Sequence, residues 1–110
     1  MLLNFVFMIE ALISSKTRIN LLVKFFLHPG TRAYLRGLSQ EFNESTNSIR
    51  LELNRFEDAG LLVSSKESNK KYYQANSSHP FFSEIKSLVL KHTGVSQIID
   101  KVIQRLGKVE

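Results

Sequence analysis

The chain contains no cysteine. Disulfide bonds are therefore excluded, and with them the disulfide framework that stabilises many small extracellular domains. The three histidines, His28, His79 and His92, are far apart and do not form a ligand spacing such as His-x-x-x-His. We interpret them as structural residues, and we expect the protein to bind no metal and no cofactor.

Signs of catalysis are also missing. The five glycines are isolated and fall where helices or turns change, so they form no glycine-rich phosphate loop. No Ser-His-Asp order or nucleophile elbow occurs. The neighbouring carboxylates, Glu41 with Glu44 and Glu57 with Asp58, lie on predicted helix surfaces or turns, where solvated carboxylates are usual. We therefore expect that the protein is not an enzyme.

The chain has no hydrophobic run long enough to cross a membrane. The apolar N-terminal segment, residues 1–13, is shorter than the roughly 20 residues that a membrane span needs. It also lacks the basic start and the small-residue cleavage site of a secretory signal. These absences predict a cytoplasmic protein with no membrane contact. The segment itself is predicted to be a helix that packs on its own domain or on a partner.

The length, hydrophobic content and charge of the chain indicate one small basic domain. A chain of 110 residues with 43% hydrophobic residues can bury a single core. The formal net charge of +5 favours a polyanionic partner, although the positive charges are spread along the whole chain.

The most informative stretch is residues 38–62, which read LSQEFNESTNSIRLELNRFEDAGLL. A helix is predicted after Ser45, whose hydroxyl can accept from a free amide of the first turn. Ile49, Leu53 and Phe56 share one face at spacings of four and three. Gly60 tolerates the left-handed conformation that ends many helices.

The opposite face of this helix is polar. At about 100° per residue, the side chains that point away from the apolar stripe are those of Asn47, Arg50, Leu51 and Asn54. In the major groove of DNA, Arg pairs with guanine edges and Asn with adenine edges. The alternative is a solvated surface helix, because amphipathic helices are common.

A shorter helix is predicted just before, over residues 37–42, with Leu38 and Phe42 on its buried side. A turn of three residues, beginning at Asn43, separates the two helices. Two helices joined by so short a turn are typical of a helix-turn-helix. Asn43 tolerates the positive φ that such a turn requires, whereas Glu44 stands where the usual pattern has an apolar residue.

A lysine-rich β-hairpin is predicted downstream. Residues 61–66 and 71–75 favour strands, and residues 67–70 link them. Its tip gathers three cations, Lys66, Lys70 and Lys71. A cationic hairpin beside a DNA-reading helix suits a wing that follows phosphates. The alternative is an exposed hairpin whose lysines prevent edge-to-edge aggregation.

Two more helical regions flank this core. Residues 15–27 favour a helix, ended by Pro29 and Gly30, with a buried stripe of Ile19, Leu22, Val23 and Phe26. After the hairpin, Pro80 is predicted to start a helix whose inner face carries Phe81, Ile85, Leu88, Val89 and His92. Thr93 and Gly94 are predicted to break it, and residues 96–106 to form a last helix with a broad apolar face.

The predicted helix-turn-helix and hairpin together resemble the ArsR-like winged-helix regulators of bacteria and archaea. The residues that match their core, cap and stop positions are Leu38, Phe42, Ser45, Ile49, Leu53, Phe56, Ala59, Gly60 and Leu61. Arg32–Arg36 resembles the short first strand and its lead-in. Asn69–Tyr73, followed by Ala75 and Asn76, resembles the wing of a subgroup whose winged helix is joined to a nucleotidyltransferase-like domain.

The resemblance covers about residues 15–94 and has three implications. Metal sensing in this family usually uses cysteine thiolates, which this chain does not have. Repression is more usual in the family than activation. A nucleotidyltransferase-like domain would begin soon after Glu110, so the chain is either the regulatory half of a longer protein or a stand-alone relative.

The sequence therefore predicts a mainly α fold with a small β-sheet, an α+β winged helix-turn-helix with extra N- and C-terminal helices. Three regions are expected: an apolar assembly helix over 1–14, the winged helix-turn-helix over 15–94, and a dimerisation or linker helix over 95–110. The expected partners are double-stranded DNA and a second copy of the chain. The alternative is a protein-interaction module or an accessory domain of a longer protein.

Within that prediction the DNA contacts divide into two groups. The residues expected to read base edges are Thr46, Asn47, Arg50, Leu51 and Asn54. The residues expected to contact phosphates are Ser45, Lys66, Lys70, Lys71, Arg32 and Arg36.

Overall fold

The computed structural model describes residues 2–13 and 15–107. Their secondary-structure elements, in chain order, are α1 (Leu2–Leu12), α2 (Lys16–Leu27), β1 (Ala33–Tyr34), α3 (Leu35–Phe42), α4 (Thr46–Asp58), β2 (Leu62–Glu67), β3 (Lys70–Ala75) and α5 (Phe82–Gly107). The protein is mostly helical with one small antiparallel sheet, of strand order β1-β3-β2. The predicted class, α+β with helices before and after the sheet region, is confirmed at this level.

The core lies where α2, α3 and α4 meet one side of the sheet. Its largest fully buried side chains are Phe25, Phe26, Leu21, Leu38, Ile49, Leu53 and Leu62. The predicted stripe of α4 is confirmed, because Ile49, Leu53 and Phe56 are all buried. These side chains hold α4 to the body of the protein and so determine which of its faces remains exposed.

The buried face of α2 was predicted only in part. Leu21, Phe25 and Phe26 are buried, whereas Ile19, Leu22 and Val23 are only partly covered. The reason is the central position of α2, which contacts α4, α5 and β3. A helix with neighbours on several sides is apolar around much of its circumference, so a single stripe does not describe it.

The connection between α3 and α4 is the short turn that the sequence predicts. Asn43 has φ 53° and ψ 46°, the left-handed conformation expected of it. The backbone amide of Glu44 donates to the carbonyl of Ser39 at 3.1 Å, and the Ser39 hydroxyl donates to the carbonyl of Glu44. The main chain of Glu44 thus fastens the turn, which explains why this position does not need an apolar side chain.

The β2–β3 hairpin is tighter than expected. Glu67 pairs with Lys70, so Ser68 and Asn69 alone form the loop. Ser68 has φ 54°, the positive value that two-residue hairpin loops require. Lys66 stands directly opposite Lys71 in this register, which places the predicted cations near the tip.

The helix after the sheet is continuous, and the predicted break at Thr93 and Gly94 is wrong. α5 begins at Phe82, two residues after Pro80, and runs without interruption to Gly107, across the expected boundary between residues 94 and 95. A glycine inside a helix costs only about 1 kcal/mol relative to alanine, and the packing of α5 on α1 and α2 outweighs that cost. Phe81 is 63% exposed, and Phe82 packs on Phe26 in its place, with ring centroids 5.5 Å apart.

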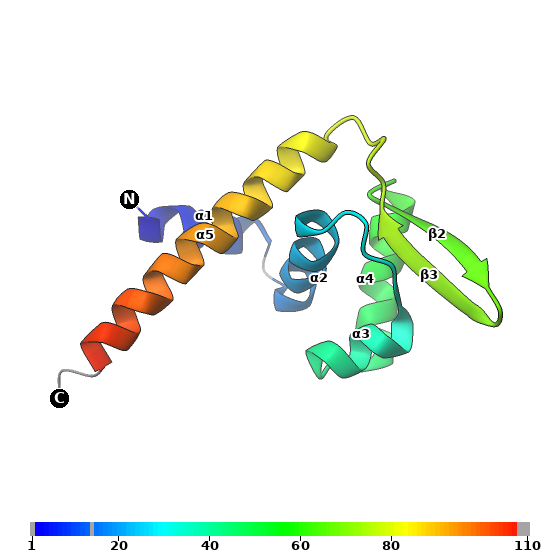
Figure 1. Ribbon diagram of the computed structural model, residues 1–110, viewed down its shortest axis with the longest axis horizontal. Helices are drawn as coiled ribbons and strands as arrows, with labels where there is room; N and C mark the ends of the chain where they lie inside the picture. Colours follow the sequence, from blue (N-terminus) through cyan, green and yellow to red (C-terminus); the bar gives the residue numbers. More distant parts are fainter. Residues whose placement is uncertain (1, 14, 108–110) are drawn as a thin grey trace.

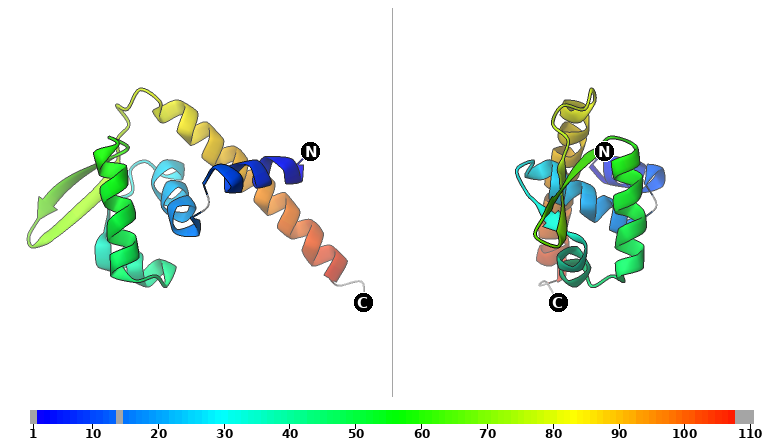
Figure 2. Two further views of the ribbon diagram at one scale, coloured as in Figure 1. Left: turned by 180° about the vertical axis from the view of Figure 1, so that it is seen from behind. Right: turned by 90° about the vertical axis from the view of Figure 1, so that its right-hand side faces the viewer.

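The protein is elongated. Its radius of gyration is 15.6 Å and its extents are 53 × 30 × 23 Å, whereas a compact chain of this length has a radius of about 13 Å. Figure 1 shows why: the β2–β3 hairpin and the C-terminal half of α5 extend toward opposite ends of the long axis. α1 packs across α5 on the side away from the hairpin (Figure 2).

No described helix combines the length and the apolar character that a membrane crossing requires.

Candidate nucleic-acid interface

The outer face of α4 is open to solvent, as the helical periodicity predicts. Five of its side chains are exposed at the positions expected to read base edges: Thr46, Asn47, Arg50, Leu51 and Asn54. Leu51, a large apolar side chain, is 52% exposed. The N-cap prediction is also confirmed, because the Ser45 hydroxyl accepts from the amide of Ser48 at 3.1 Å.

A groove of about 610 Å³ separates α4 from the β2–β3 hairpin. Its lining residues come from α4, from β1 and the start of α3, and from β3 with its loop: Tyr34, Leu35, Arg36, Arg50, Leu53, Asn54, Asn69, Lys70, Lys71 and Tyr73. Two predicted base-reading residues, Arg50 and Asn54, therefore lie in one groove with three predicted phosphate contacts, Arg36, Lys70 and Lys71. We call this feature the α4–hairpin groove.

The electrostatics of the α4–hairpin groove are one-sided. Among its lining residues there are four cations and no carboxylate. Asn54, Asn69 and the tyrosines add polar groups that carry no charge. A concave surface lined by one sign of charge concentrates the potential, so it attracts a polyanion more strongly than its net charge alone implies.

One carboxylate lies just outside the groove and holds its far wall. Glu57 of α4 accepts from Lys71 Nζ at 3.1 Å and from the hydroxyl of Ser64 in β2. The hydrogen bonds from Ser64 and Lys71 lower the pKa of Glu57, and the bond to Glu57 raises the pKa of Lys71. Ser64 and Lys71 thus tie the hairpin to α4, and part of the charge of Lys71 is neutralised.

A second carboxylate of α4 is turned inward. Glu52 is buried and receives a bidentate contact from Arg18 of α2, with Nε–Oε1 2.7 Å and Nη2–Oε2 3.2 Å. The hydrogen bond with Glu52 raises the pKa of Arg18. Arg55 lies 3.5 Å from the same carboxylate. The negative charge of Glu52 is therefore compensated on the inner side of α4 and does not oppose a polyanion at the outer face.

Three predicted phosphate contacts lie outside the groove. Arg32 does not line the groove, and it contacts Ser65 at 3.2 Å, Glu67 at 3.2 Å and the ring of Tyr72 at 4.7 Å. The Ser45 hydroxyl also bonds the Ser48 hydroxyl at 2.9 Å, so it is engaged within the helix cap. Lys66 is exposed on β2 but does not line the groove.

The prediction missed the aromatic part of the groove. Tyr34 and Tyr73 line it, and Lys70 Nζ lies 4.3 Å from the centre of the Tyr34 ring. The strand tendency of Tyr73 is readable from the sequence. Its place in the groove depends on the sheet register, which pairs it with Ala33 and Ser64.

Within residues 2–13 and 15–107, no three His, Asp or Glu side chains come together in a way that could hold a metal ion.

Comparison with protein-family models, with curated proteins and with solved structures finds no match to the chain.

Proposed function

We propose that the protein is a winged helix-turn-helix that binds double-stranded DNA and regulates transcription in the cytoplasm, as a repressor rather than an activator. In this proposal α3 and α4 are the two helices of the motif, and the β2–β3 hairpin is the wing. The protein catalyses no reaction. The observation that supports the proposal best is the α4–hairpin groove, which combines four cations with two amide side chains and contains no acid.

The proposed mechanism assigns separate tasks to the two walls of the groove. α4 enters the major groove, where Arg50 contacts guanine and Asn54 contacts adenine. Thr46, Asn47 and Leu51, which continue the exposed face, contact neighbouring base edges, and Leu51 suits a thymine methyl group. Arg36 and Lys70 contact the phosphate backbone that lies between α4 and the hairpin. These phosphate contacts supply affinity and register, and the base contacts supply sequence preference.

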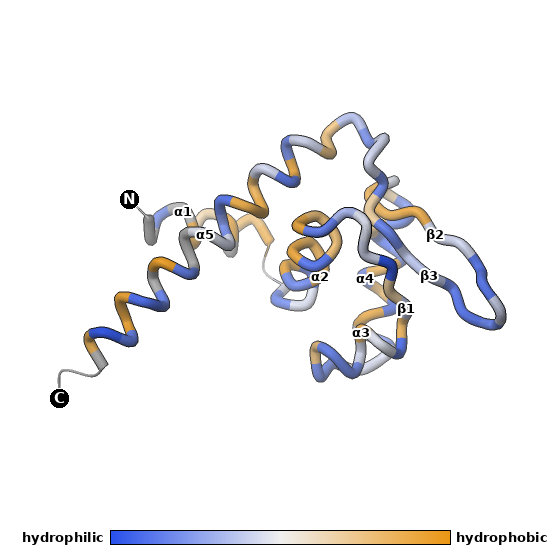
Figure 3. The backbone as a smooth tube through the Cα atoms, viewed as in Figure 1, coloured by the Kyte–Doolittle hydropathy of each residue, from blue (hydrophilic) through white to orange (hydrophobic). Residues whose placement is uncertain are grey.

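The proposed active form is a homodimer. Two copies related by a twofold axis would place their α4 helices in successive major grooves about 34 Å apart, on a pseudo-palindromic site. The face available for assembly is on the distal half of α5, where Ile98, Val102, Ile103 and Leu106 are all about half exposed or more. Figure 3 shows hydrophobic residues recurring along α5 to its end, far from the α4–hairpin groove.

The test is a titration with duplex DNA at several salt concentrations, followed by selection of bound sequences from a random duplex pool. We expect log Kd to depend steeply on log salt, because phosphate neutralisation releases counterions. Arg50→Glu should weaken binding strongly. The matched control is Lys101→Glu, which makes the same charge change on exposed distal α5. Equal losses in both variants would mean that net charge, and not the groove, causes the binding.

A second candidate function is that of a protein-interaction or accessory domain within a longer protein that carries a nucleotidyltransferase-like domain. The observation in its favour is the amount of exposed apolar surface on distal α5, together with exposed Leu51. This function predicts no salt-dependent binding to any duplex and a folded partner domain in the longer reading frame.

A further inference from the structure

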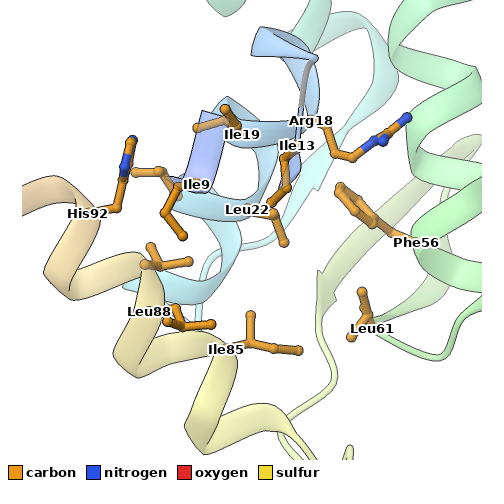
Figure 4. Close-up of a pocket in the computed structure, with 12 residues that line it drawn as sticks. Ile9, Ile13, Arg18, Ile19, Leu22, Phe56, Leu61, Ile85, Leu88 and His92 are labelled. Atoms are coloured by element: carbon orange, nitrogen blue, oxygen red, sulfur yellow. The ribbon is translucent and has the colours of Figure 1, made fainter. Parts of the chain in front are cut away.

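A second concave feature lies on the other side of α4, remote from the proposed DNA-binding surface. It is a partly open cavity of about 290 Å³ between α1, α2, the end of α4 and the proximal half of α5. Figure 4 shows Leu22 of α2 and Ile85 of α5 pointing toward one another across it, with Phe56 and Leu61 at one end and Ile9 and Leu88 at the other. We call it the α2–α5 cavity.

The α2–α5 cavity presents only carbon. Ten of its twelve lining residues are aliphatic or aromatic. Arg18 contributes its methylene groups, because its guanidinium is directed toward α4 and bound to Glu52 (Figure 4). Water at such a lining finds no hydrogen-bond partner, so its displacement by an apolar molecule is favourable. The volume of the cavity approaches the roughly 300 Å³ at which ordinary ligand sites begin.

The shape of the cavity favours a small molecule over a protein segment. Nearly all of its lining side chains are buried or partly buried, and Leu88 is the only one among the large exposed hydrophobic residues. The surface is therefore recessed, unlike the protruding apolar face of distal α5.

We propose that the α2–α5 cavity is a binding site for one small, uncharged, largely hydrocarbon molecule of one to two rings or comparable branched size. Burial of apolar surface supplies the affinity. The guanidinium of Arg18 is bound to Glu52, and His92 exposes no polar atom to the cavity, so a charged ligand would lose its hydration without gaining a partner. The ligand would touch Phe56 in the last turn of α4 and the stem of Arg18, whose guanidinium holds Glu52 in the middle of α4. Occupancy would therefore act on the helix that we propose reads DNA.

The binding test uses N-phenyl-1-naphthylamine, an uncharged dye that fluoresces in apolar surroundings. We expect saturable binding of one dye per chain. Leu22→Phe and Ile85→Phe fill the cavity from opposite walls, and each should weaken dye binding tenfold or more. Circular dichroism and thermal denaturation establish that each variant is folded, and either variant suffices. The matched control, Val63→Phe on exposed β2, should bind the dye as the unchanged protein does.

Three results would overturn the proposal: dye binding that does not saturate, equal binding in the cavity-filling and control variants, or binding that follows protein concentration as copies associate. The last result would assign the space to an interface between copies. A separate measurement tests the link to α4, which rests on the proposed DNA binding. Saturating dye should change the Kd for duplex by about fivefold or more. An unchanged Kd in a protein that binds both dye and duplex would reject the link, whereas absence of duplex binding would reject the proposed function alone.

Discussion

Arg50 and Arg55 are the same residue type on the same helix, but their surroundings differ. Arg50 is proposed to contact DNA bases, whereas Arg55 forms an ion pair within the protein. Arg50 is exposed and lines the α4–hairpin groove. Arg55 lies on the side toward α2, 3.5 Å from the buried carboxylate of Glu52. The comparison of these two residues therefore tests which side of α4 contacts DNA.

Arg50→Ala should cost about 1–3 kcal/mol on the preferred duplex and relax the sequence preference at one position. Arg55→Ala should leave both almost unchanged, because an exposed ion pair at a spacing of three contributes less than about 0.5 kcal/mol. Fluorescence anisotropy with the selected duplex and with single-base variants measures both effects. Intact specific affinity in Arg50→Ala would remove this residue from the proposed reading surface.

Glu57 connects protonation to stability. Its pKa is lowered in the folded protein by Ser64 and Lys71, so its contribution is present above its ordinary pKa of 4.5 and is lost as the pH falls through the folded value. The raised pKa of Lys71 acts in the opposite sense. The contribution of Lys71 is present below its ordinary pKa of 10.5 and is lost as the pH rises through the folded value. The pair therefore stabilises the fold between these two limits.

Glu57→Gln should lower the free energy of unfolding at pH 7 by up to about 1 kcal/mol, the usual range for solvent-screened pairs. The difference from the unchanged protein should disappear at acid pH, where Glu57 is protonated in both folded and unfolded chains. Urea denaturation at pH 7 and pH 3 measures this. Asp58→Asn, the neighbouring exposed acid at the helix end, is the control and should show no loss at either pH. A pH-independent difference would mean that the side chain acts by packing.

At the scale of elements, the proposed DNA contact of the hairpin depends on two lysines, Lys70 and Lys71, that differ in their ion pairing. Lys70 lies over the Tyr34 ring and has no carboxylate within ion-pair distance among the described residues, whereas Lys71 is paired with Glu57. A lysine that must break an ion pair within the protein before it contacts a phosphate contributes less to the binding free energy. The hairpin therefore offers less than two full charges to DNA.

Replacing both Lys70 and Lys71 with Ala should weaken binding to all duplexes alike and lower the salt slope by at most about two units. Of the single variants, Lys70→Ala should lower the slope more than Lys71→Ala. Titrations at four salt concentrations with specific and random duplexes provide the slopes. An unchanged slope in the double variant would exclude the hairpin from the interface.

α4 and the hairpin could be predicted because several local signals agree there. The cap at Ser45, the stripe through Ile49 and Leu53, and the stop at Gly60, which has φ 76°, all indicate the same helix. The contents of the groove could not be predicted in the same way. The position of Tyr73 depends on strand register, and the Glu57–Lys71 pair joins residues that are separated by a strand and a loop.

The continuity of α5 could not be predicted from the sequence for a different reason: a glycine is compatible with either the end or the interior of a helix. Gly94 can end a helix or lie inside one, and the packing of the neighbouring turns decides between the two. The proximal half of α5 packs on α1 and α2, and this anchors a helix that continues through the glycine. A methyl group added at Gly94 would meet no atom within 4 Å, and its φ is not positive.

Gly94→Ala should therefore stabilise the protein by about 0.5–1 kcal/mol, the usual gain inside a helix. Gly60→Ala is the opposite case, because φ 76° strains any residue with a Cβ, and it should destabilise the protein by about 1–2 kcal/mol. Thermal and urea denaturation of the two variants measure the pair. Destabilisation by Gly94→Ala would restore the break that the sequence alone suggests.

At the scale of the whole molecule, the elongated shape separates three surfaces. Figure 1 shows α4 and the β2–β3 hairpin, which line the groove, toward one end and the distal half of α5 at the other. The α2–α5 cavity lies between them, lined by α1, α2 and the proximal half of α5. α5 spans about 39 Å at 1.5 Å per residue, so the proposed assembly face lies well away from the groove. A dimer formed there would leave both grooves free.

The two ends of the molecule are therefore predicted to be separable by mutation. Val102→Asp with Leu106→Asp places two charges in the apolar face of distal α5, where these residues are 51% and 67% exposed. Burying unpaired charges opposes association, so sedimentation should show monomers at concentrations where the unchanged chain is dimeric. Gln97→Asp with Gln104→Asp adds the same charge to exposed polar positions of the helix and should leave the dimer intact.

The monomeric variant also distinguishes the role of the dimer in binding. Its affinity for random duplex should fall little, because each groove is complete within one chain. Its affinity for a two-half-site duplex should fall much more, because the second groove is no longer held at an effective concentration near the first. Equal affinity of the monomeric and dimeric forms for the two-half-site duplex would mean that a single chain carries the whole recognition. The apolar end of α5 would then serve another partner.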